Sequence, residues 1–291
     1  MQQSAENLDN KIKQLWPKDG PSSQEVEKYI KKYSKEKIVI KCGGKVLLDE
    51  SLLNSLIEDV AILKKLGLTP ILVHGGGLGI KKKLAAQNIE SKFIMGLRVT
   101  DDKMIGIVED VMTKFNKKIV KALEEKSCKA KSITVKENNI IHVEQENKEL
   151  GFVGKPKRVD VKLLKEIIKE DFVPVITPMG IDDAGNSYNI NGDTAAGAVA
   201  QSIKSRRLIL LTDIDGVLDN NNKLIPEIKT MEAEQLISNE IIHGGMIPKI
   251  KSCCAAIHNG VRAVAIIDGR KPHSILFELF SDQGSGTLIR K

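Results

Sequence analysis

Two glycine-rich turns follow apolar segments of the chain and have the composition of anion-binding turns. Residues 43–44 are glycines that follow the apolar run 38–40, and residues 75–77 are three glycines that follow the run 71–73. At the carboxyl end of a parallel strand, such turns point backbone N–H groups toward a ligand. A glycine pair is equally typical of a plain tight turn. Three glycines in succession favour the close approach of an anion, because glycine weakens a fold wherever no such approach requires it.

Two basic residues stand in unusual places. Arg98 lies in the small apolar segment 96–100, where it is either a surface arginine with a buried stem or a ligand for an anion. Lys249 falls in the first turn of a helix expected from residue 248 to residue 259, where the helix dipole disfavours a cation. We therefore expect an anionic group beside Lys249.

A short polar segment ends in an acidic residue. Asp193 precedes a helix expected from residue 194 and is placed to cap it. Capping alone would explain this aspartate, but it does not explain the two asparagines, Asn189 and Asn191, that flank a single isoleucine. The segment is therefore a second candidate for ligand binding.

Several nucleotide-binding and nucleophilic motifs are absent from the sequence. No GxxxxGK[ST] occurs, which excludes a P-loop NTPase, and no GxGxxG follows a strand, so a dinucleotide fingerprint is missing. His74 and the three glycines after it also match an esterase oxyanion loop. Because the chain has no GxSxG nucleophile elbow, most of the case for a hydrolase is removed.

The composition is that of an ordinary globular protein. The 291 residues include 45 Lys and Arg against 38 Asp and Glu, and this net charge of +7 favours anionic ligands without requiring a nucleic acid. No apolar run approaches the roughly 18 residues of a membrane span, and residues 1–10 lack the apolar segment of a signal peptide. The four cysteines, at positions 42, 128, 253 and 254, lack the spacing of a metal site. We expect reduced thiols and a cytoplasmic protein, or one whose transit peptide has been removed.

Strands, glycine turns and helices alternate from residue 38 onward, which predicts the βα units of a parallel sheet. Ahead of them, Val26, Ile30 and Tyr33 have helical spacing within 24–34 and predict an amphipathic helix. Periodicity does not decide whether this helix frays or packs on another subunit. The expected strands are 38–40, 71–73, 173–177, 208–211 and 263–267; the expected helices are 52–67, 80–88, 111–125, 161–169, 194–202, 231–238 and 248–259; and 132–135 with 140–143 is expected to form a hairpin at an edge.

Six motifs resemble, in this order, those of the N-acetylglutamate kinases, a branch of the amino acid kinase family. The resemblance extends from about Ile38 to the C-terminus, and one departure is Met95, where many relatives carry Asn. The first and fifth motifs are family-wide, whereas the combination of the second, third and fourth points to the acetylglutamate branch. The six are Lys41-Cys42-Gly43-Gly44, His74-Gly75-Gly76-Gly77, Gly96-Leu97-Arg98-Val99-Thr100, Asn189-Ile190-Asn191-Gly192-Asp193, Leu211-Thr212-Asp213-Ile214-Asp215-Gly216-Val217 and Gly244-Gly245-Met246-Ile247-Pro248-Lys249.

The resemblance implies an α/β fold, a three-layer αβα sandwich around a mainly parallel open sheet that continues across two lobes. It implies a helical arm over 1–37 for assembly and regulation. It further implies an N-lobe over 38–204 that binds acetylglutamate and forms a dimer, and a C-lobe over 205–291 that binds ATP and arginine.

The implied activity is transfer of the γ-phosphoryl group of ATP to the γ-carboxylate of N-acetyl-L-glutamate, the second step of arginine biosynthesis. A carboxylate is already ionised at neutral pH, so no general base is needed, and the reaction depends on charge neutralisation. By resemblance Lys41, Lys249 and Asp193 are catalytic; Gly75, Gly76, Arg98, Asn189 and Asn191 bind the acceptor; and Gly43, Gly44, Thr212, Asp213, Gly216, Val217, Ile247 and Lys249 bind ATP. Mg²⁺ is expected mainly on the phosphates, with no certain protein ligand.

The N-terminal helix and the segment 273–287 also resemble the arginine-inhibited branch, which assembles as a hexamer, a trimer of dimers. Tyr29, Glu278 and His273 are the implied contacts of arginine, and a PII-type signalling protein is an implied partner. Neither a nucleic acid nor a membrane is expected. Two alternatives stay open: a sister kinase for acetylaminoadipate or glutamate, and a catalytically silent protein that binds arginine or PII.

Overall fold

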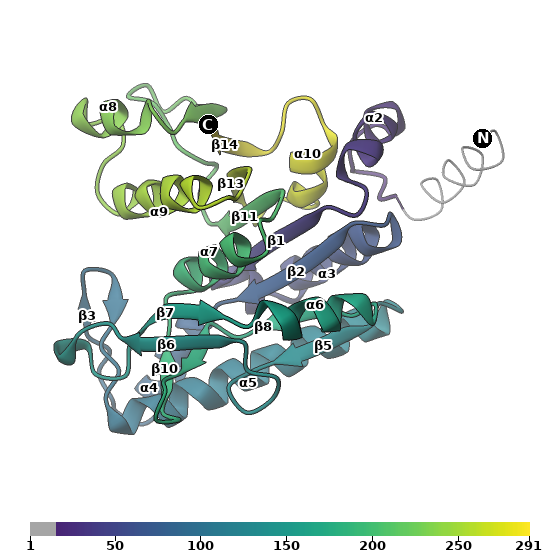
Figure 1. Cartoon of the computed structure of the whole chain (residues 1–291). Coiled ribbons are helices and arrows are strands. Elements are labelled where there is room, and N and C mark those ends of the chain that lie inside the picture. The colour runs from purple at the N-terminus through teal and green to yellow at the C-terminus, as the bar shows by residue number, and fades with distance from the viewer. Residues whose placement is uncertain (1–15) are drawn as a thin grey trace.

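The computed structural model describes residues 16–291 and is built around an eight-stranded sheet (Figure 1). The strand order is β12-β14-β13-β11-β1-β2-β8-β5, and every neighbouring pair is parallel except β13 with β14. The prediction of a mainly parallel sheet is therefore confirmed. The strands are β1 (Lys37–Cys42), β2 (Thr69–His74), β5 (Ala130–Ile133), β8 (Val173–Ile176), β11 (Arg207–Thr212), β12 (Glu227–Lys229), β13 (Ala263–Asp268) and β14 (Gly286–Arg290).

Both faces of this sheet are buried, because its strands are apolar at consecutive positions. Ile38 and Ile40 of β1 pack into one core, whereas Val39 packs into a second core on the opposite face. The same alternation holds in β11 and β13. Helices α2, α3, α5 and α10 lie against the first core and α6, α7 and α9 against the second, which makes three layers.

Side-chain caps fix the start of most of the long helices. The aspartates at 49, 101 and 160 accept backbone N–H groups at the starts of α3, α5 and α6. Helices α4 and α9 have no such cap, so their first N–H groups have no side-chain partner. The helices are α2 (Ser23–Tyr33), α3 (Glu50–Lys65), α4 (Gly77–Ala85), α5 (Asp102–Glu125), α6 (Val161–Lys169), α7 (Gly192–Ser202), α8 (Ala233–Ser238), α9 (Met246–His258) and α10 (Ser274–Phe280), with 3-10 turns η1 (Gly44–Leu47) and η2 (Lys148–Leu150).

The expected hairpin of 132–135 with 140–143 is wrong. Strand β5 is the edge of the large sheet and pairs in parallel with β8. Strand β6 (Ile141–Gln145) belongs instead to a second sheet, of order β10-β9-β6-β7, where it pairs with β7 (Gly154–Val159). A tight turn does connect the two segments, but Ile141 and Val143 contribute to the second core through the separate sheet.

The second sheet was not predicted, and it positions part of the site. Its remaining strands, β9 (Met179–Ile181) and β10 (Ser187–Asn189), are antiparallel and enclose the turn expected at 182–186. A two-stranded ribbon of β3 (Phe93–Ile94) and β4 (Leu97–Arg98) lies nearby at the same end of the molecule (Figure 1).

The amphipathic helix expected over 24–34 is confirmed as α2. Val26, Ile30 and Tyr33 are buried against the chain's own core, and the ring of Phe280 in α10 lies 6.2 Å from that of Tyr33, edge to face. Within the described residues, this helix therefore packs against the C-terminal half of the same chain. The part of the expected arm formed by residues 1–15 lies outside the described residues.

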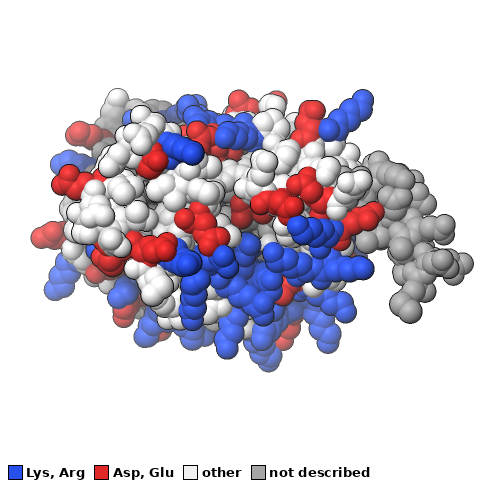
Figure 2. Space-filling model, turned by 90° about the horizontal axis from the view of Figure 1, so that it is seen from above, with Lys and Arg blue, Asp and Glu red and all other residues white. Residues whose placement is uncertain are grey.

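Charges are distributed unevenly on the surface. In the view from above, Lys and Arg side chains gather along one side, while both signs mix over the rest (Figure 2). The net charge of +7 is thus partly concentrated, which favours the approach of anions. None of the helices within 16–291 has the length and apolar composition needed to span a bilayer.

Candidate active site

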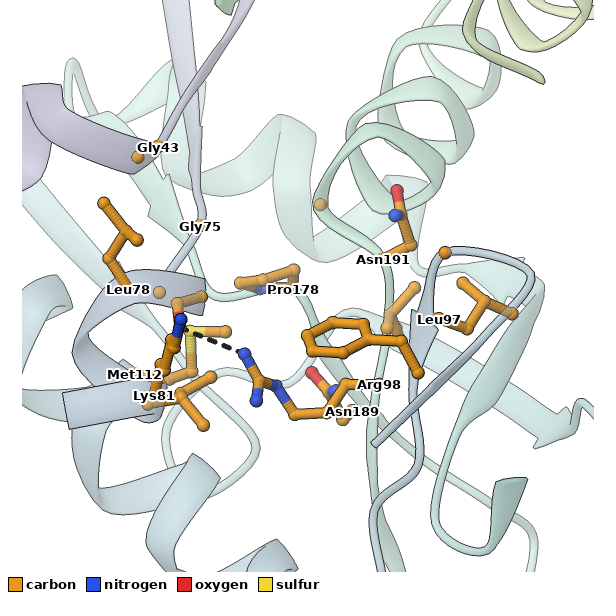
Figure 3. Close-up of a pocket in the computed structure, with 18 of the residues that line it drawn as sticks. Gly43, Gly75, Leu78, Lys81, Leu97, Arg98, Met112, Pro178, Asn189 and Asn191 are labelled. Atoms are coloured by element: carbon orange, nitrogen blue, oxygen red, sulfur yellow. Dashed lines mark hydrogen bonds between the residues drawn. The ribbon is translucent and has the colours of Figure 1, made fainter. Parts of the chain in front are cut away.

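A cavity of about 670 Å³ opens at the carboxyl ends of β1 and β2. Strand β1 contributes Lys41, and the two glycine turns predicted to bind an anion form one side of the cavity. Arg98 of β4 and the segment of Asn189 and Asn191, which are far apart in the sequence, line the same space (Figure 3). The cavity is lined by Lys41, Gly43, Gly44, Gly75, Gly76, Gly77, Leu78, Ile80, Lys81, Ser91, Phe93, Gly96, Leu97, Arg98, Met112, Val153, Pro178, Asn189, Ile190, Asn191 and Gly192.

One glycine in each turn is required, Gly44 by its backbone conformation and Gly76 by close packing. Gly44 has a φ of +59°, a conformation that favours glycine. A Cβ on Gly76 would lie 2.6 Å from the Sδ of Met112, and a Cβ on Gly43 would lie 3.6 Å from the Nζ of Lys41. Gly76 is the N-cap of α4, which has no side-chain cap, and Gly76, Gly77 and Leu78 at this helix start line the cavity, which suits an anionic ligand.

Two lysines from different layers meet on one carboxylate. The Nζ of Lys41, at the end of β1, lies 2.8 Å from Oδ1 of Asp193, and the Nζ of Lys249, from the first turn of α9, donates to Oδ2. All three side chains are at least four-fifths buried. Burial alone would raise the pKa of Asp193, but the two ammonium groups outweigh burial and lower that pKa to about 2. Asp193 is therefore the anionic group expected beside Lys249.

The predicted capping role of Asp193 is wrong. Helix α7 begins at Gly192, and its N-cap is Asn191, whose Oδ1 accepts the N–H of Asp193 at 2.9 Å and that of Thr194 at 3.2 Å. Asp193 thus stands in the first turn, where the helix dipole favours its negative charge. This cap explains Asn191, one of the two asparagines that flank the isoleucine.

Arg98 is buried, which excludes the interpretation as a surface arginine. It is 8% exposed, donates to Ser91 and to the carbonyl of Gly77 at 3.0 Å, and packs over the ring of Phe93 at 4.7 Å. These contacts leave the guanidinium charge without a carboxylate partner among the described residues. Asn189 is also 8% exposed and its Nδ2 reaches Oγ1 of Thr100. The cavity therefore offers a fixed cation and an amide for an anionic, polar ligand.

Of the residues expected to bind ATP, Gly43 and Gly44 line the cavity, whereas the others lie at or after the carboxyl end of β11 and at the start of α9, outside its lining. Ile247 joins Lys249 in the first turn of α9. Thr212 and Asp213 end and follow β11, and the hydroxyl of Thr212 bonds to carbonyls of its own loop and of β13. Gly216 and Val217 are engaged in packing, as a Cβ on Gly216 would lie 2.7 Å from Leu224 and the N–H of Val217 donates to Thr287 at 2.8 Å.

A second pocket of about 280 Å³ lies between α2 and the C-terminal segment. Tyr29 and Glu278 line it together, whereas His273 does not and instead pairs with the buried carboxylate of Asp59 at 2.6 Å. Burial raises the pKa of Glu278, although Arg207 lies 3.9 Å away. The pocket therefore holds a buried acidic group, Glu278, beside the basic side chain of Arg207.

Two buried residues beside the cavity were not assigned a role from the sequence. His74 ends β2, and Asn116 lies in the middle of α5; both are fully buried and 3.3 Å apart. The position of a histidine directly before the three glycines was a signal for the first. No sequence pattern marks the second, which is joined to the site only by the packing of α5 on the sheet.

The chain is similar to proteins of known activity. Residues 36–268 match the model of the amino acid kinase family. The acetylglutamate kinase of Pelagibacter ubique is 59% identical over 277 residues, which cover 95% of this chain and 96% of that protein. The acetylglutamate kinase of Caldanaerobacter subterraneus is 44% identical over 269 residues, which cover 90% of each.

Solved structures give the same fold. An N-acetylglutamate synthase of Neisseria gonorrhoeae, complexed with coenzyme A and N-acetyl-glutamate, has a TM-score of 0.84 at 26% identity, covering 92% of this chain and 62% of that one. The same synthase complexed with coenzyme A and L-arginine has a TM-score of 0.79 at 26% identity, covering 92% and 64%. This chain thus spans less than two thirds of the synthase.

Proposed function

The chain belongs to the amino acid kinase family, and we propose that it transfers the γ-phosphoryl group of ATP to the γ-carboxylate of N-acetyl-L-glutamate, a step of arginine biosynthesis. The observation that carries this proposal is the meeting of Lys41 and Lys249 on Asp193 beside a glycine-lined cavity. Relatives that share up to 59% of the sequence over nearly its whole length are acetylglutamate kinases, which supports the same acceptor here.

The acceptor binds in the cavity, where each of its two carboxylates meets a group that favours negative charge. Arg98 pairs with the α-carboxylate, because it is a buried cation with no carboxylate of its own. Asn189 and the free Nδ2 of Asn191 bond to the N-acetyl amide region. Gly75 and Gly76 face the γ-carboxylate from the glycine turn.

Transfer depends on neutralising charge rather than on moving a proton, since the attacking carboxylate is already ionised. Lys41 and Lys249 lie on either side of the path between nucleotide and acceptor, and the fully ionised Asp193 holds both ammonium groups in place. Backbone N–H groups of Gly43, Gly44 and Gly76 stabilise the oxygens of the moving phosphoryl group.

The nucleotide binds over the carboxyl end of β11 and the start of α9, with Thr212, Asp213, Gly216, Val217, Ile247 and Lys249 as the proposed contacts. The uncapped N–H groups of α9 suit a phosphate. Residues 16–291 contain no cluster of three side chains that would ligate a metal, and Asp193 is already occupied by two lysines. Mg²⁺ enters as part of the substrate, the Mg²⁺ complex of ATP, held mainly by the phosphates.

The test is a coupled assay of ADP release from the purified chain with ATP, Mg²⁺ and one acceptor at a time. N-acetyl-L-glutamate should be the preferred acceptor over acetylaminoadipate and glutamate. Preference for either of the other acids would identify a sister kinase. If none of the three acids causes release of ADP, the proposal is overturned. Binding of arginine by such an inactive protein would indicate the regulatory alternative.

Feedback inhibition by arginine is the second part of the proposal. The pocket between α2 and the C-terminal segment supports it, because Glu278 is a buried carboxylate suited to a guanidinium and the hydroxyl of Tyr29 donates to Asp282 at the rim. The synthase that shares this fold was solved with L-arginine, which is a property of that protein and lends support here. His273 does not line the pocket, and its proposed part in arginine binding is indirect, through its ion pair with Asp59.

Assembly and location complete the proposal. We place acetylglutamate binding and dimer formation in 38–204, ATP and arginine binding in 205–291, and assembly into a trimer of dimers in the arm 1–37. The molar mass in solution, with and without the arm, tests the hexamer.

Binding of a PII-type protein stays a prediction, tested by the molar mass of a mixture of this chain with a PII-type protein. An ATP-using biosynthetic enzyme with four unpaired cysteines is expected to work in the cytoplasm.

A further inference from the structure

His74 and Asn116 form a buried hydrogen-bonded chain that ends on the backbone of Gly75. The Nδ1 of His74 lies 3.0 Å from the carbonyl oxygen of Gly75, and its Nε2 lies 3.3 Å from the Nδ2 of Asn116. The same Nδ2 donates to the carbonyl of Val175 in β8 at 2.8 Å. The three side-chain contacts join α5 and two strands to the glycine turn.

These contacts fix the proton positions. The carbonyl of Gly75 is an acceptor, so Nδ1 of His74 must carry the proton, and Nε2 is left as the acceptor for Asn116. The amide of Asn116 is oriented by Val175, because turning the amide over would place two oxygens against each other. Burial lowers the pKa of His74 to about 4, so the ring is neutral at physiological pH.

The arrangement determines the direction of one peptide N–H in the cavity. The N–H of Gly75 donates to the carbonyl of Cys42 at 2.6 Å, and the carbonyl of Gly75 is held by His74, so both polar groups of this residue are engaged. In a planar trans peptide the carbonyl of Gly75 and the N–H of Gly76 point in opposite directions. Because the carbonyl points to the buried ring, the N–H of Gly76 points away from it, toward the cavity that Gly76 lines.

The asparagine is not explained by stability alone. Its Oδ1 has no hydrogen-bond partner among the described residues, and a buried acceptor left unpaired destabilises the fold. An apolar side chain of similar volume would avoid that cost. What the amide supplies, and an apolar residue does not, is a donor to Nε2 that reinforces the Nδ1–H tautomer favoured by the carbonyl of Gly75 and holds the ring in place.

We propose that Asn116 is a positioning residue for phosphoryl transfer, acting through the Nδ1–H tautomer of His74 to hold the N–H of Gly76 toward the transferred group. This inference rests on the proposed function, in which that N–H stabilises the phosphoryl oxygens. Neither side chain lines the cavity, so neither touches the substrates.

The experiment compares Asn116→Leu with the wild type in steady-state kinetics and by ¹⁵N NMR of the imidazole. We expect kcat to fall about 10- to 100-fold, as for other displacements of a transition-state donor, while the KM for ATP stays within about threefold. The wild-type ring should be the Nδ1–H tautomer, and Asn116→Leu should give a mixture of tautomers. Wild-type kcat in Asn116→Leu, or an Nε2–H ring in the wild type, would overturn the proposal.

Two further variants separate positioning from packing. His74→Asn places an amide N–H near the position of Nδ1 and should retain at least about tenfold more turnover than His74→Leu. Ile119→Val, one turn along the same buried face of α5, weakens packing and should lower the melting temperature without changing kcat. A loss of kcat in Ile119→Val equal to that in Asn116→Leu would refute a specific role.

The outcome is distinguishable from failure of the proposed function. If the wild type phosphorylates none of the three acceptors, the proposed function fails, whereas the tautomer of His74 and its change in Asn116→Leu still report on the contact. If the wild type is active and the variant keeps full activity, only the positioning role fails.

Discussion

Asn191 accepts the backbone N–H of Asp193 at 2.9 Å and thereby caps α7, which leaves the carboxylate of Asp193 to bind two lysines. The site therefore uses Asn191 to cap the helix and Asp193 to bind the two lysines. A helix start that used the aspartate as its own cap would have no group left to hold Lys41 and Lys249 together.

Loss of either lysine should abolish most turnover. Lys41→Ala and Lys249→Ala are each expected to lower kcat by on the order of a hundredfold or more, because each removes a positive charge from the path of the phosphoryl group. The melting temperature and circular dichroism should show an intact fold. Wild-type turnover in either variant would contradict the assignment of these two lysines.

Stability should depend on the ionisation of Asp193 at low pH. Its pKa is lowered to about 2 from an ordinary 3.8, so the ionised carboxylate stabilises the folded state by about 2 kcal/mol above pH 4, and this part is lost as the pH falls toward 2. Urea unfolding at pH 7, 4 and 3 tests this. The difference in free energy of unfolding between the wild type and Asp193→Asn should shrink between pH 4 and pH 3, and a constant difference would contradict the role given to the ion pairs.

Replacement of Arg98 should affect one substrate only. Arg98→Ala is expected to raise the KM for acetylglutamate at least about tenfold and leave the KM for ATP unchanged, since the guanidinium faces the acceptor cavity. Arg98→Lys should recover only part of the loss, because an ammonium cannot form the two-pronged contact. The exposed Arg158→Ala serves as a control for charge alone, and a change confined to ATP would rule out the role given to Arg98.

Inhibition by arginine should depend on Glu278. Glu278→Gln is expected to raise the concentration of arginine needed for half-inhibition at least about tenfold, because the neutral amide no longer pairs with the guanidinium. Glu227→Gln is the matched control, as Glu227 lines the same pocket but is more exposed and pairs with Arg290 at 2.8 Å, whereas the buried Glu278 lies 3.9 Å from Arg207. The kcat without arginine should stay unchanged in both. Unaltered inhibition in Glu278→Gln would place the effector elsewhere.

Met95 should be a site where stability can be gained. It lies at the tip of the β3–β4 ribbon with a φ of +49°, a strained backbone conformation for Met. Its side chain is 96% exposed and therefore packs against little else. Asn tolerates this conformation, and Met95→Asn is expected to stabilise the fold by about 0.5–1 kcal/mol. Met231→Asn is the control, because Met231 is 82% exposed but is not among the residues of positive φ. Equal shifts in melting temperature in both variants would exclude the backbone explanation.

Much of the fold could be predicted because its signals are local. Buried parallel strands are short apolar runs, and the helical spacing of Val26, Ile30 and Tyr33 is directly visible. The hairpin prediction failed for a reason that is not local. Residues 130–133 and 141–145 are both strand-forming and close in sequence, but each finds its partner in a different sheet.

The site shows the same limit. The glycine turns and Arg98 were identifiable because glycine at strand ends and a cation among small residues are unusual in themselves. Asn116 was not, since an asparagine within a helix gives no hint that it is fully buried against His74. Likewise the sequence favoured Asp193 as a cap, because the choice between it and Asn191 depends on where the first helical turn closes.

The ladder between β1 and β11 joins the half of the chain that carries Arg98 to the half that carries the start of α9. Four in-register residue pairs link the two, from Ile38 with Arg207 to Lys41 with Leu210. Each half pairs with the edge strand of the other. If one half unfolded, the backbone N–H and C=O groups of the other half's edge strand would therefore lose their partners. Heating should therefore give one calorimetric transition for both halves, and any movement of one half relative to the other must bend or twist the sheet that they share.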